Sequence, residues 1–371
     1  MFVFGDYAFL ASLYGLSGAK GTYCCLWCHI QQKELQVPLS HRGLSSRRKL
    51  KNMKKHHKDF RSKGRGKLSA ASSYKNCIHE PLLDINISHV CPPYLHILLG
   101  IVKRHNDLLE ERVHQVEEQI ADEISLSRAK LGNTLFHNHI EDLRKFRKNL
   151  NRLGFLKAER EEDGDLTERE RTKLNKDIAS LEAIVKSGKP KLNSQNGPIV
   201  QALEKALKRH KIVKQSYHSR SFVGNHCSKY IKTSVQDDIS ATLQEITCEL
   251  SGNGDISKKM QQICKTFNEL NGLFSDVHNM VAHMAEVDNK DIQVAEQNIE
   301  KYMAYFRQHF PNSVFPKLHF LEDHIVPWMK RWGVWTCTTW RTRWGGYPSR
   351  NQQNTKKYVP CCRSFNETSL H

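Results

Sequence analysis

Apolar residues recur every three or four positions along most of the chain after residue 94, which is the spacing of an amphipathic α-helix. The longest run extends from about Leu95 to Ser127 and follows a Pro92-Pro93 turn. The same spacing predicts further helices at about 135–153, 166–185, 199–210, 235–250, 257–273, 278–286 and 293–309. The pattern therefore predicts a mainly α protein built around a large helical block.

The part of the chain before this block has a different pattern. Met1 to Phe4 is a short apolar run that predicts a buried strand, with Asp6 at its carboxyl end. Tyr7 to Leu16 predicts a short helix or turn. A carboxylate placed directly after a buried strand is a candidate catalytic residue. The alternative is that Asp6 caps the helix that follows.

Charge adds a second feature before residue 94. The chain has 57 Lys and Arg against 39 Asp and Glu, for a formal net charge of +18, which favours a polyanionic partner such as DNA. Arg42 to Lys67 is dense in Lys and Arg, with Asp59 as its acid. We interpret residues 31–76 as a basic, disordered loop, and a solvated linker without a ligand is the alternative. The candidate DNA-binding cations are Arg47, Arg48, Lys49, Lys51, Lys54 and Lys55.

Cysteine usage and hydropathy bear on the compartment. The 11 cysteines are spread through a long chain with 20 histidines, and we find no signal peptide before them. This favours a reducing compartment and a metal site over a disulfide scaffold. No apolar run approaches the roughly 18 residues that a membrane span requires. We therefore expect a soluble protein with no membrane partner.

Two widely separated motifs supply metal-ligand chemistry: Cys25-Leu-Trp-Cys28 and His319-x4-His324. A CxxC places two thiolates on a tight turn, and two imidazoles complete a tetrahedral zinc site. Two residues five apart on a regular α-helix differ by about 140°. We therefore expect the histidines to converge only if His319 lies at or before a helix start, near Pro316. The alternative is a pair of core cysteines and a pair of surface histidines.

Residues beside these motifs are weaker candidates. Cys24 and His29 flank the CxxC and rank second as ligands, because Cys25 and Cys28 have the turn spacing. Glu322 and Asp323 do not form an HExxH motif, which excludes a zincin protease. We expect these two acids to be solvated helix charges.

The motifs occur in an order that resembles a known family. They are Gly5-Asp6, Leu13-Tyr-Gly-Leu-Ser-Gly18, Cys25-Leu-Trp-Cys28, Leu83-Asp-Ile85, Phe222-Val-Gly-Asn-His226 and His319-Phe-Leu-Glu-Asp-His324. In this order they resemble the catalytic core of the Transib transposases and of the V(D)J recombinase that descends from them. Each motif alone is short, so the resemblance depends on their order together with the zinc spacings. It covers nearly the whole chain.

The resemblance implies a fold and an activity. The family has an RNase H-like α/β core with a DDE triad, interrupted by a large helical zinc-binding insertion, and cleaves and joins DNA in the nucleus with Mg2+. Two such ions stabilise the attacking and leaving oxygens of a phosphoryl displacement, and they take carboxylate ligands. Asp6 matches the second acid of the triad, and Cys25, Cys28, His319 and His324 match the structural Zn2+ ligands. The resemblance also implies a homodimer.

The resemblance divides the chain into five parts. They are a remnant RNase H-like strand with Asp6 and the CxxC half-site (1–30), a basic loop (31–76), a helical insertion (77–310), a helix with the HxxxxH half-site (311–334) and a tail (335–371).

Two departures from the family pattern concern the acids. The chain begins on the strand that bears Asp6, so we expect the first acid to be missing. The third is also missing, because the family's Gly-Glu-x-Gly-x-Glu region is replaced by Trp335-Thr-Cys-Thr-Thr-Trp-Arg-Thr-Arg-Trp-Gly-Gly-Tyr-Pro348. Read one base later, Trp340 to Pro348 can encode Gly-Glu-Gln-Gly-Gly-Glu-Asp-Ile-His. We therefore interpret 335–371 as out-of-frame, disordered sequence after a frameshift near Val334; a genuine Trp-rich, nucleic-acid-binding tail is the alternative.

The sequence thus predicts an inactive fragment of a DDE-type transposase that keeps its zinc-bound helical insertion. A domesticated, zinc-stabilised module that binds DNA or a protein without chemistry is the alternative. A third interpretation is a decayed element with no function.

Overall fold

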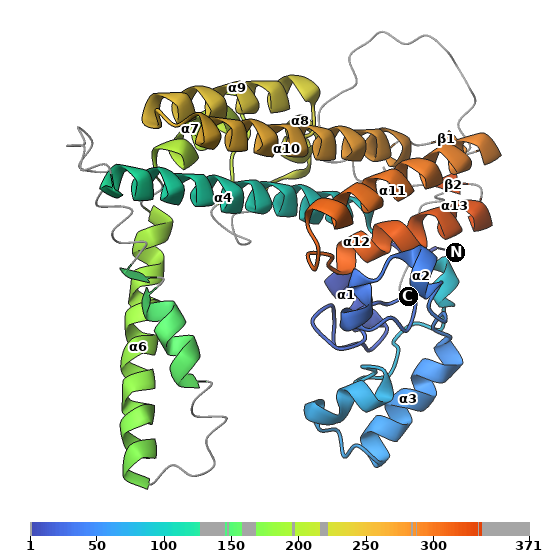
Figure 1. Ribbon diagram of the computed structural model, residues 1–371. Coiled ribbons are helices and arrows are strands. Elements are labelled where there is room, and N and C mark those ends of the chain that lie inside the picture. Colours follow the sequence, from blue (N-terminus) through green and yellow to red (C-terminus); the bar gives the residue numbers. More distant parts are fainter. Residues whose placement is uncertain are drawn as a thin grey trace, which may run out of the picture. The chain divides into compact units, whose positions relative to one another are not determined.

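The computed structural model describes residues 2–126, 145–146, 148–157, 168–194, 197–215, 222–282, 285–286, 288–332 and 334–335, all within one compact unit, Met1–Cys337. This part of the chain is mainly helical (Figure 1), which confirms the prediction from apolar spacing. No helix in it is long and apolar enough to span a bilayer.

The α-helices are α1 (Tyr7–Leu13), α2 (Leu39–Arg42), α3 (Leu50–Ser62), α4 (Tyr94–Leu126), α6 (Glu168–Ser194), α7 (Pro198–Arg209), α8 (Gly224–Tyr230), α9 (Thr233–Leu250), α10 (Gly254–Val281), α11 (Asn289–His309), α12 (Pro316–Phe320) and α13 (Val326–Trp332). The 3-10 helices are η1 (Gln32–Gln36), η2 (Leu68–Tyr74) and η3 (Ile87–His89), and η4 (Leu321–Ile325) is a π-helix. The strands β1 (Ala285–Glu286) and β2 (Val334–Trp335) pair antiparallel.

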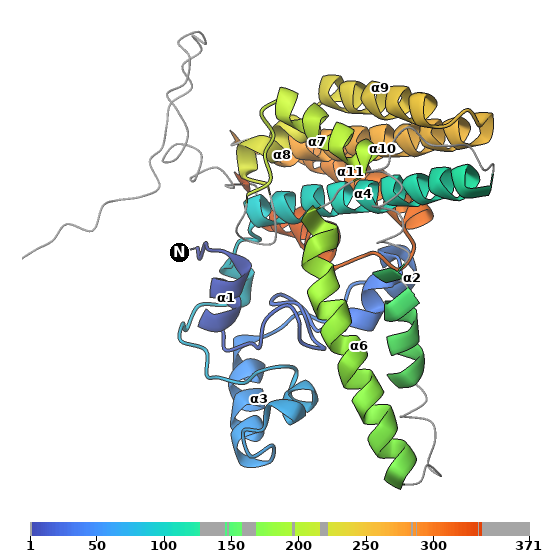
Figure 2. The same ribbon diagram turned by 90° about the vertical axis from the view of Figure 1, so that its left-hand side faces the viewer.

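The helical block consists of α4, α7, α9, α10 and α11. α10 lies against α4, α9 and α11, and α7 contacts both α4 and α9, an arrangement that Figures 1 and 2 show from two sides. The core between them is apolar, and side chains such as Phe274, Leu270 and Phe306 are fully buried. Burial of these large side chains is the main stabilising contribution in this block.

Two buried polar groups inside the block have hydrogen-bond partners on other helices. The His105 ring lies 2.9 Å from Asn271 Oδ1 and 2.8 Å from the Tyr302 hydroxyl. Burial lowers the pKa of His105 to about 4, so the imidazole is neutral in the fold. The buried Glu117 carboxylate accepts hydrogen bonds from the backbone N–H of Ile199 (2.8 Å) and Val200 (3.1 Å), and so caps α7 from α4. These contacts fix how the helices cross.

The predicted break between 257–273 and 278–286 is wrong, because one helix, α10, runs from Gly254 to Val281. Phe274, Val277 and Val281 continue its apolar face through the predicted gap and are all fully buried. The predicted helix at 166–185 extends to Ser194. The one at 135–153 lies only partly within the described residues, and residues 148–157 are helical and pack on α6 through Leu153.

The predicted buried strand at Met1–Phe4 is also wrong. Val3 forms an isolated parallel bridge with Val90, while Phe2 and Phe4 are 43% and 40% exposed. The bridge consists of the hydrogen bonds Val3 N–H to His89 O and Cys91 N–H to Val3 O, both 3.0 Å. Because Val3 is the one residue that pairs, these residues do not form a strand, although the Phe2 ring packs on Trp328 at 5.6 Å and on Trp332 at 5.0 Å.

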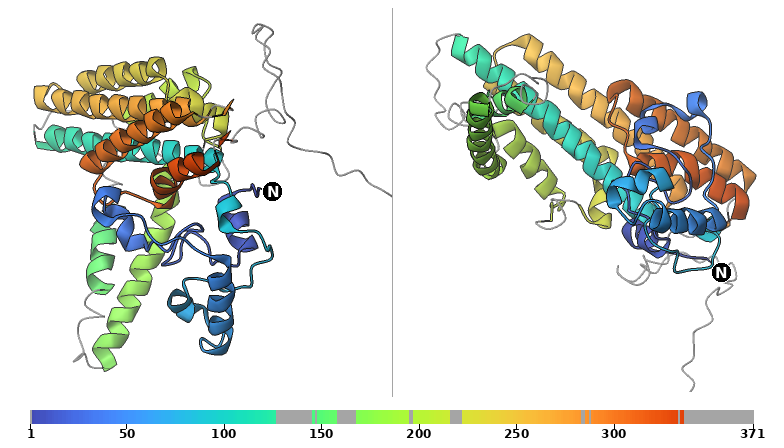
Figure 3. Two further views of the ribbon diagram at one scale, coloured as in Figure 1. Left: turned by 90° about the vertical axis from the view of Figure 1, so that its right-hand side faces the viewer. Right: turned by 90° about the horizontal axis from the view of Figure 1, so that it is seen from below.

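The basic segment 31–76 is ordered, which corrects the prediction of a disordered loop. It contains η1, α2, α3 and η2. On α3, Met53 and Phe60 lie two turns apart and are buried, and the Phe60 ring packs on Tyr74 of η2 at 6.0 Å. This small apolar face is sufficient to dock α3, while its Lys and Arg side chains remain on the outside. Figure 3 shows α3 from two further directions.

Candidate metal centre

The CxxC lies in a buried turn that hydrogen bonds from other segments hold in place. Residues 24–28 are at most 6% exposed. The Tyr7 hydroxyl donates to the Cys24 carbonyl at 2.5 Å, which ties the turn to α1. On the other side, Arg48 N–H donates to Trp27 O at 3.0 Å, and Cys28 forms an antiparallel bridge with Arg47. The turn is therefore held between α1 and the segment that precedes α3.

Arg48 is part of this support. Its side chain is 3% exposed, and its Nε donates to the carbonyls of Cys25 at 2.8 Å and Cys28 at 3.2 Å. One guanidinium nitrogen also donates to the Lys75 carbonyl at 2.9 Å. Buried carbonyl oxygens need such partners, because an unsatisfied one costs about 1–3 kcal/mol. The prediction that Arg48 binds DNA is therefore wrong.

The two histidines lie within one helical run, which corrects the expectation that His319 stands at or before a helix start. His319 is in α12, and His324 is in the π-helix η4 that directly follows. A π-helix hydrogen-bonds residue i to residue i+5 and so has more residues per turn than an α-helix, which brings residues five apart nearer to one face. The π-turn thus reduces the offset of about 140° that a regular α-helix would impose. It aims both imidazoles at the CxxC.

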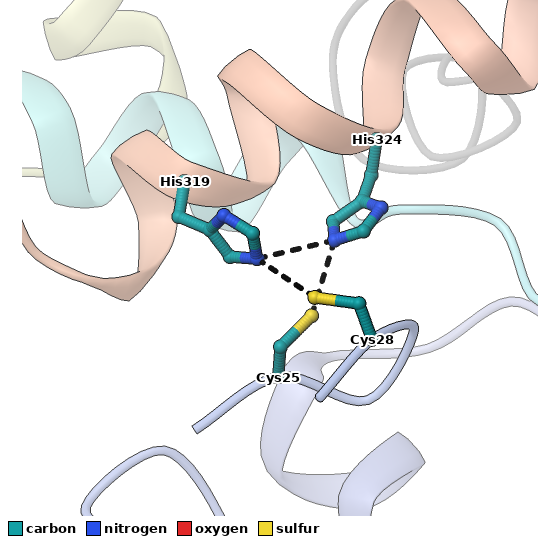
Figure 4. A group of neighbouring side chains, drawn as sticks. All are labelled: Cys25, Cys28, His319 and His324. Atoms are coloured by element: carbon teal, nitrogen blue, oxygen red, sulfur yellow. Dashed lines mark hydrogen bonds between the residues drawn. The ribbon is translucent and has the colours of Figure 1, made fainter. Parts of the chain in front are cut away.

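The four predicted ligands meet at one point (Figure 4). Their Sγ and Nε2 atoms all lie within 4.8 Å of one another. Cys25 Sγ is 3.2 Å from His324 Nε2, and Cys28 Sγ is 3.4 Å from His319 Nε2. The two Nε2 atoms are 3.2 Å apart. The prediction that these residues come together is confirmed, and the alternative of core cysteines with surface histidines is wrong.

The spacing of the donor atoms fits a tetrahedral ion. Zn–N bonds of about 2.0–2.1 Å and Zn–S bonds of about 2.3 Å place two nitrogens about 3.3 Å apart and a nitrogen and a sulfur about 3.6 Å apart. The observed distances of 3.2 and 3.4 Å are close to these values. Two thiols and two imidazoles are also the donor set that zinc favours. The cluster can therefore bind a metal such as zinc.

A buried carboxylate orients one of the histidines, which corrects the expectation that Asp323 is solvated. Asp323 is 2% exposed, and its Oδ1 lies 3.2 Å from Nδ1 of His319. Arg42 binds the same carboxylate with both terminal nitrogens, at 2.8 and 2.6 Å. A carboxylate that accepts from the far ring nitrogen favours the tautomer that leaves Nε2 free to bind a metal, and Asp323 lies within reach of that role.

The charges in this group follow from these contacts. Burial alone would raise the pKa of Asp323, but Arg42 and His319 hold it well below its usual range. Burial lowers the pKa of His319, but Asp323 and Cys28 outweigh this effect and raise the pKa to about 9. Glu322 is not solvated either, since Arg307 binds both of its oxygens at 2.7 Å.

The thiols differ in their surroundings. Burial raises the pKa of Cys25, whereas a hydrogen bond from Cys25, together with those from the imidazoles, lowers the pKa of Cys28. The flanking Cys24 and His29 are outside the cluster. Burial raises the pKa of Cys24 to about 12 and lowers that of His29 to about 4. The ranking of these two residues below Cys25 and Cys28 is confirmed.

Aromatic rings pack beside the histidines of the centre. Phe320, from the helical run between the two histidines, packs on Tyr7 at 4.7 Å and on Trp27 at 5.3 Å. The Trp27 ring also lies 5.5 Å from the His324 ring. Exclusion of water strengthens the interaction between a metal and its ligands.

Asp6 is placed as a helix cap. Its side chain is exposed and accepts a hydrogen bond from Phe9 N–H at 2.8 Å, at the start of α1. Among the described residues, the Cys25, Cys28, His319 and His324 group is the one set of three or more His, Cys, Asp or Glu side chains arranged to hold a metal. Asp6 therefore has the capping role that the sequence left as an alternative.

The other cations predicted to bind DNA lie on the surface. Arg47, Lys49, Lys51, Lys54 and Lys55 are all exposed. Lys54 also pairs with Asp84 at 2.9 Å, a contact in which both side chains remain open to solvent. Residues 336–371 lie outside the described part of the chain, so the frameshift interpretation stays a prediction.

The sequence analysis missed two contributors to this centre, Arg42 and Asp323. The available signal was the spacing of His319 and Asp323, which places them on one helix face. Comparison with known proteins gives no match to a family model and none to a curated protein.

Proposed function

We propose that this chain is the zinc-organised, DNA-binding part of a DDE-type transposase of the Transib and V(D)J-recombinase kind, and that it does not cut DNA by itself. The observation that carries the proposal is the Cys25, Cys28, His319 and His324 cluster. It joins the two ends of a helical stretch, as the family's zinc-bearing insertion would require.

The role proposed for the metal is structural. Four protein donors fill a tetrahedral zinc shell and leave no position for water or substrate, which distinguishes structural from catalytic zinc sites. When bound, zinc would cross-link the turn after α1 to the α12–η4 run. Cys25, Cys28, His319 and His324 would hold it, and Asp323 would orient His319.

The proposal of inactivity depends on the carboxylates. Phosphoryl transfer with two Mg2+ ions requires several acids around the ions. Asp6 caps α1, and the described residues offer no further acids grouped with it. The remnant RNase H-like core and the Mg2+ site of an intact parent enzyme therefore belong to this proposal.

DNA binding is supported by charge. The chain carries a net +18, and α3 presents Lys51, Lys55 and Lys58 to solvent on a docked helix. Cations held on a rigid element lose less entropy on binding phosphates than cations on a loose loop. Nuclear localisation and a homodimer, as in the parent family, are part of the same proposal.

Two experiments test the proposal. Incubation of the full chain with supercoiled plasmid in Mg2+ or Mn2+ should give no nicking, and nicking that Asp6→Ala abolishes would overturn the claim of inactivity. Affinity for duplex DNA should fall steeply with salt, because binding releases counterions. Lys55→Glu with Lys58→Glu should weaken binding more than the matched pair Lys208→Glu with Lys265→Glu. Equal losses from the two pairs, or no affinity at low salt, would contradict DNA binding through α3.

A further inference from the structure

A cavity of about 370 Å³ lies beside the metal centre. It is bounded by the CxxC turn, the segment before α3, the residues around η3, and the run from η4 into α13. One wall contains the metal-ligand candidate His324. His324 therefore belongs both to the wall of the cavity and to the metal-ligand cluster.

The lining of this cavity is strongly basic. Arg47, Lys49 and Lys51 line it from one side and Arg331 from the other, while no Asp or Glu is among its described lining residues. All four of these side chains are exposed, and none forms an ion pair with a described carboxylate. By contrast, Arg42 forms an ion pair with Asp323, and Arg307 forms one with Glu322.

The backbone holds these cations at fixed positions. Arg47 is in the bridge to Cys28, and Lys49 is the N-cap residue of α3. The Arg331 guanidinium lies 5.2 Å from the centre of the Trp332 ring, which restricts it by a cation–π contact. Pre-organised cations bind an anion with a smaller entropic penalty.

Trp328 also lines the cavity. Trp328 is 7% exposed, and its Nε1–H has no hydrogen-bond partner in the described part of the chain. Buried donors normally have an acceptor. By contrast, the indole N–H groups of Trp27 and Trp332 donate to Val90 O and Ser88 O. The Nε1 atom of Trp328 is itself buried, so the four cations rather than this donor are the groups that meet a ligand in the cavity.

We propose that this cavity, lined by Arg47, Lys49, Lys51, Arg331 and Trp328, binds a phosphate ester beside the metal centre. Phosphate supplies several acceptor oxygens and the negative charge that the unpaired cations lack. The source is a phosphate of a nucleic-acid strand or of a free nucleotide. The first source rests on the proposed DNA binding and gives it a specific point of contact.

Binding is tested with duplex DNA, using a double variant, Arg47→Ala with Arg331→Ala. The matched control, Lys208→Ala with Lys265→Ala, removes the same charge from α7 and α10. The cavity variant should lose about tenfold in affinity, and the slope of log affinity against log salt should fall by about 1 to 2. The control should change neither the affinity nor the salt slope by a comparable amount. Zinc content equal to wild type shows that the fold is retained.

Occupancy is tested separately with protein loaded with Co2+ in place of zinc, whose visible absorption reports on the environment of His324. Inorganic phosphate, a dinucleotide and duplex DNA should each shift the bands in wild type and not in the cavity variant. A shift with dinucleotide but no affinity for duplex would support the cavity with a free nucleotide as the source, and would reject the proposed DNA binding. If both double variants weaken DNA binding equally and the Co2+ spectrum does not shift, phosphate binding in this cavity is refuted. The proposed DNA binding itself is then retained.

Discussion

The helical block and the metal centre contrast in what stabilises them. In the block, long helices bury large apolar side chains such as Phe274 and Phe306, and hydrogen bonds at His105 tie three helices together. Around the metal centre, elements are short, and Arg48 satisfies carbonyls that no secondary structure pairs. The block thus resembles an ordinary helical core, whereas we propose that the region around Cys25 depends on a metal cross-link. The two regions should respond differently to perturbation.

Metal removal should separate the two regions most strongly. After chelation we expect residues 2–93 to become accessible to protease, because ligand binding supplies much of the folding free energy where regular structure is sparse. The helices α4, α9, α10 and α11 should stay resistant. Limited proteolysis with mass spectrometry locates the cuts. Cys28→Ser should reproduce this pattern, while the matched buried Cys264→Ser should not; identical digestion with and without chelator would refute the contrast.

A substitution in the apolar core should instead destabilise the helical block. Phe274→Ala removes a fully buried ring that packs 5.5 Å from His105 and 5.1 Å from Tyr302. We expect a loss of about 3–5 kcal/mol in the free energy of unfolding, measured with urea in excess zinc. Val294→Ala, at a position on α11 that is 43% exposed, should change it by less than about 0.5 kcal/mol. The Phe274→Ala variant should still bind zinc at low temperature, where it remains folded.

The pH dependence of stability sharpens the same contrast. His105 has a pKa of about 4 in the fold, against 6.5 when unfolded. Between these values only the unfolded state binds the proton. The stability that neutral His105 contributes to the fold is therefore fully present above pH 6.5 and is lost as the pH falls to 4. Below pH 4 this group causes no further loss. This contribution amounts to on the order of 3 kcal/mol.

The measurement is urea unfolding of wild type and His105→Leu between pH 7 and pH 4. Both proteins contain the metal ligands, so the difference between them cancels the pH dependence of metal binding. His105→Leu should be less stable at pH 7 and should show the shallower decline. Parallel curves would show that His105 is not buried in its neutral form.

The smallest effect concerns the residue that orients His319. Asp323→Asn keeps the size of the side chain but removes its charge, and we expect zinc affinity to fall by about 10- to 100-fold without a change in stoichiometry. Competition with a chromophoric chelator measures this. Glu322→Gln is the matched control, because its partners are Arg42 and Arg307 rather than a ligand. An equal loss from both variants would assign the effect to the ion-pair network as a whole.

The sequence predicted the helical block well because apolar spacing is a local signal. α4, α7, α9 and α11 agree with the predicted segments to within a few residues. Pro198 starts α7 and Asp288 caps α11, whereas α9 follows Lys232 without a side-chain cap. The failure within α10 arose because polar residues at Ser275 and Asp276 appeared to interrupt an apolar face that Phe274 and Val277 continue.

The candidate site was predictable in its ligands but not in its geometry. Ligand type and CxxC spacing identified Cys25 and Cys28, whereas the π-turn at Leu321–Ile325 has no local sequence rule that would place it. The roles of Asp323 and Arg48 depend on contacts between residues distant in the chain, such as Arg42 with Asp323. Such contacts appear only once the fold is known. The docking of α3 similarly depends on Met53 and Phe60 finding neighbours outside the helix.

The central claim is that Cys25, Cys28, His319 and His324 bind one zinc ion that joins the ends of the helical stretch. The most direct measurement is elemental analysis of the purified full chain combined with X-ray absorption at the zinc edge. We expect one zinc per chain, with two sulfur ligands at about 2.3 Å and two nitrogen ligands at about 2.0–2.1 Å. Absence of stoichiometric zinc, or a shell without sulfur, would contradict the claim.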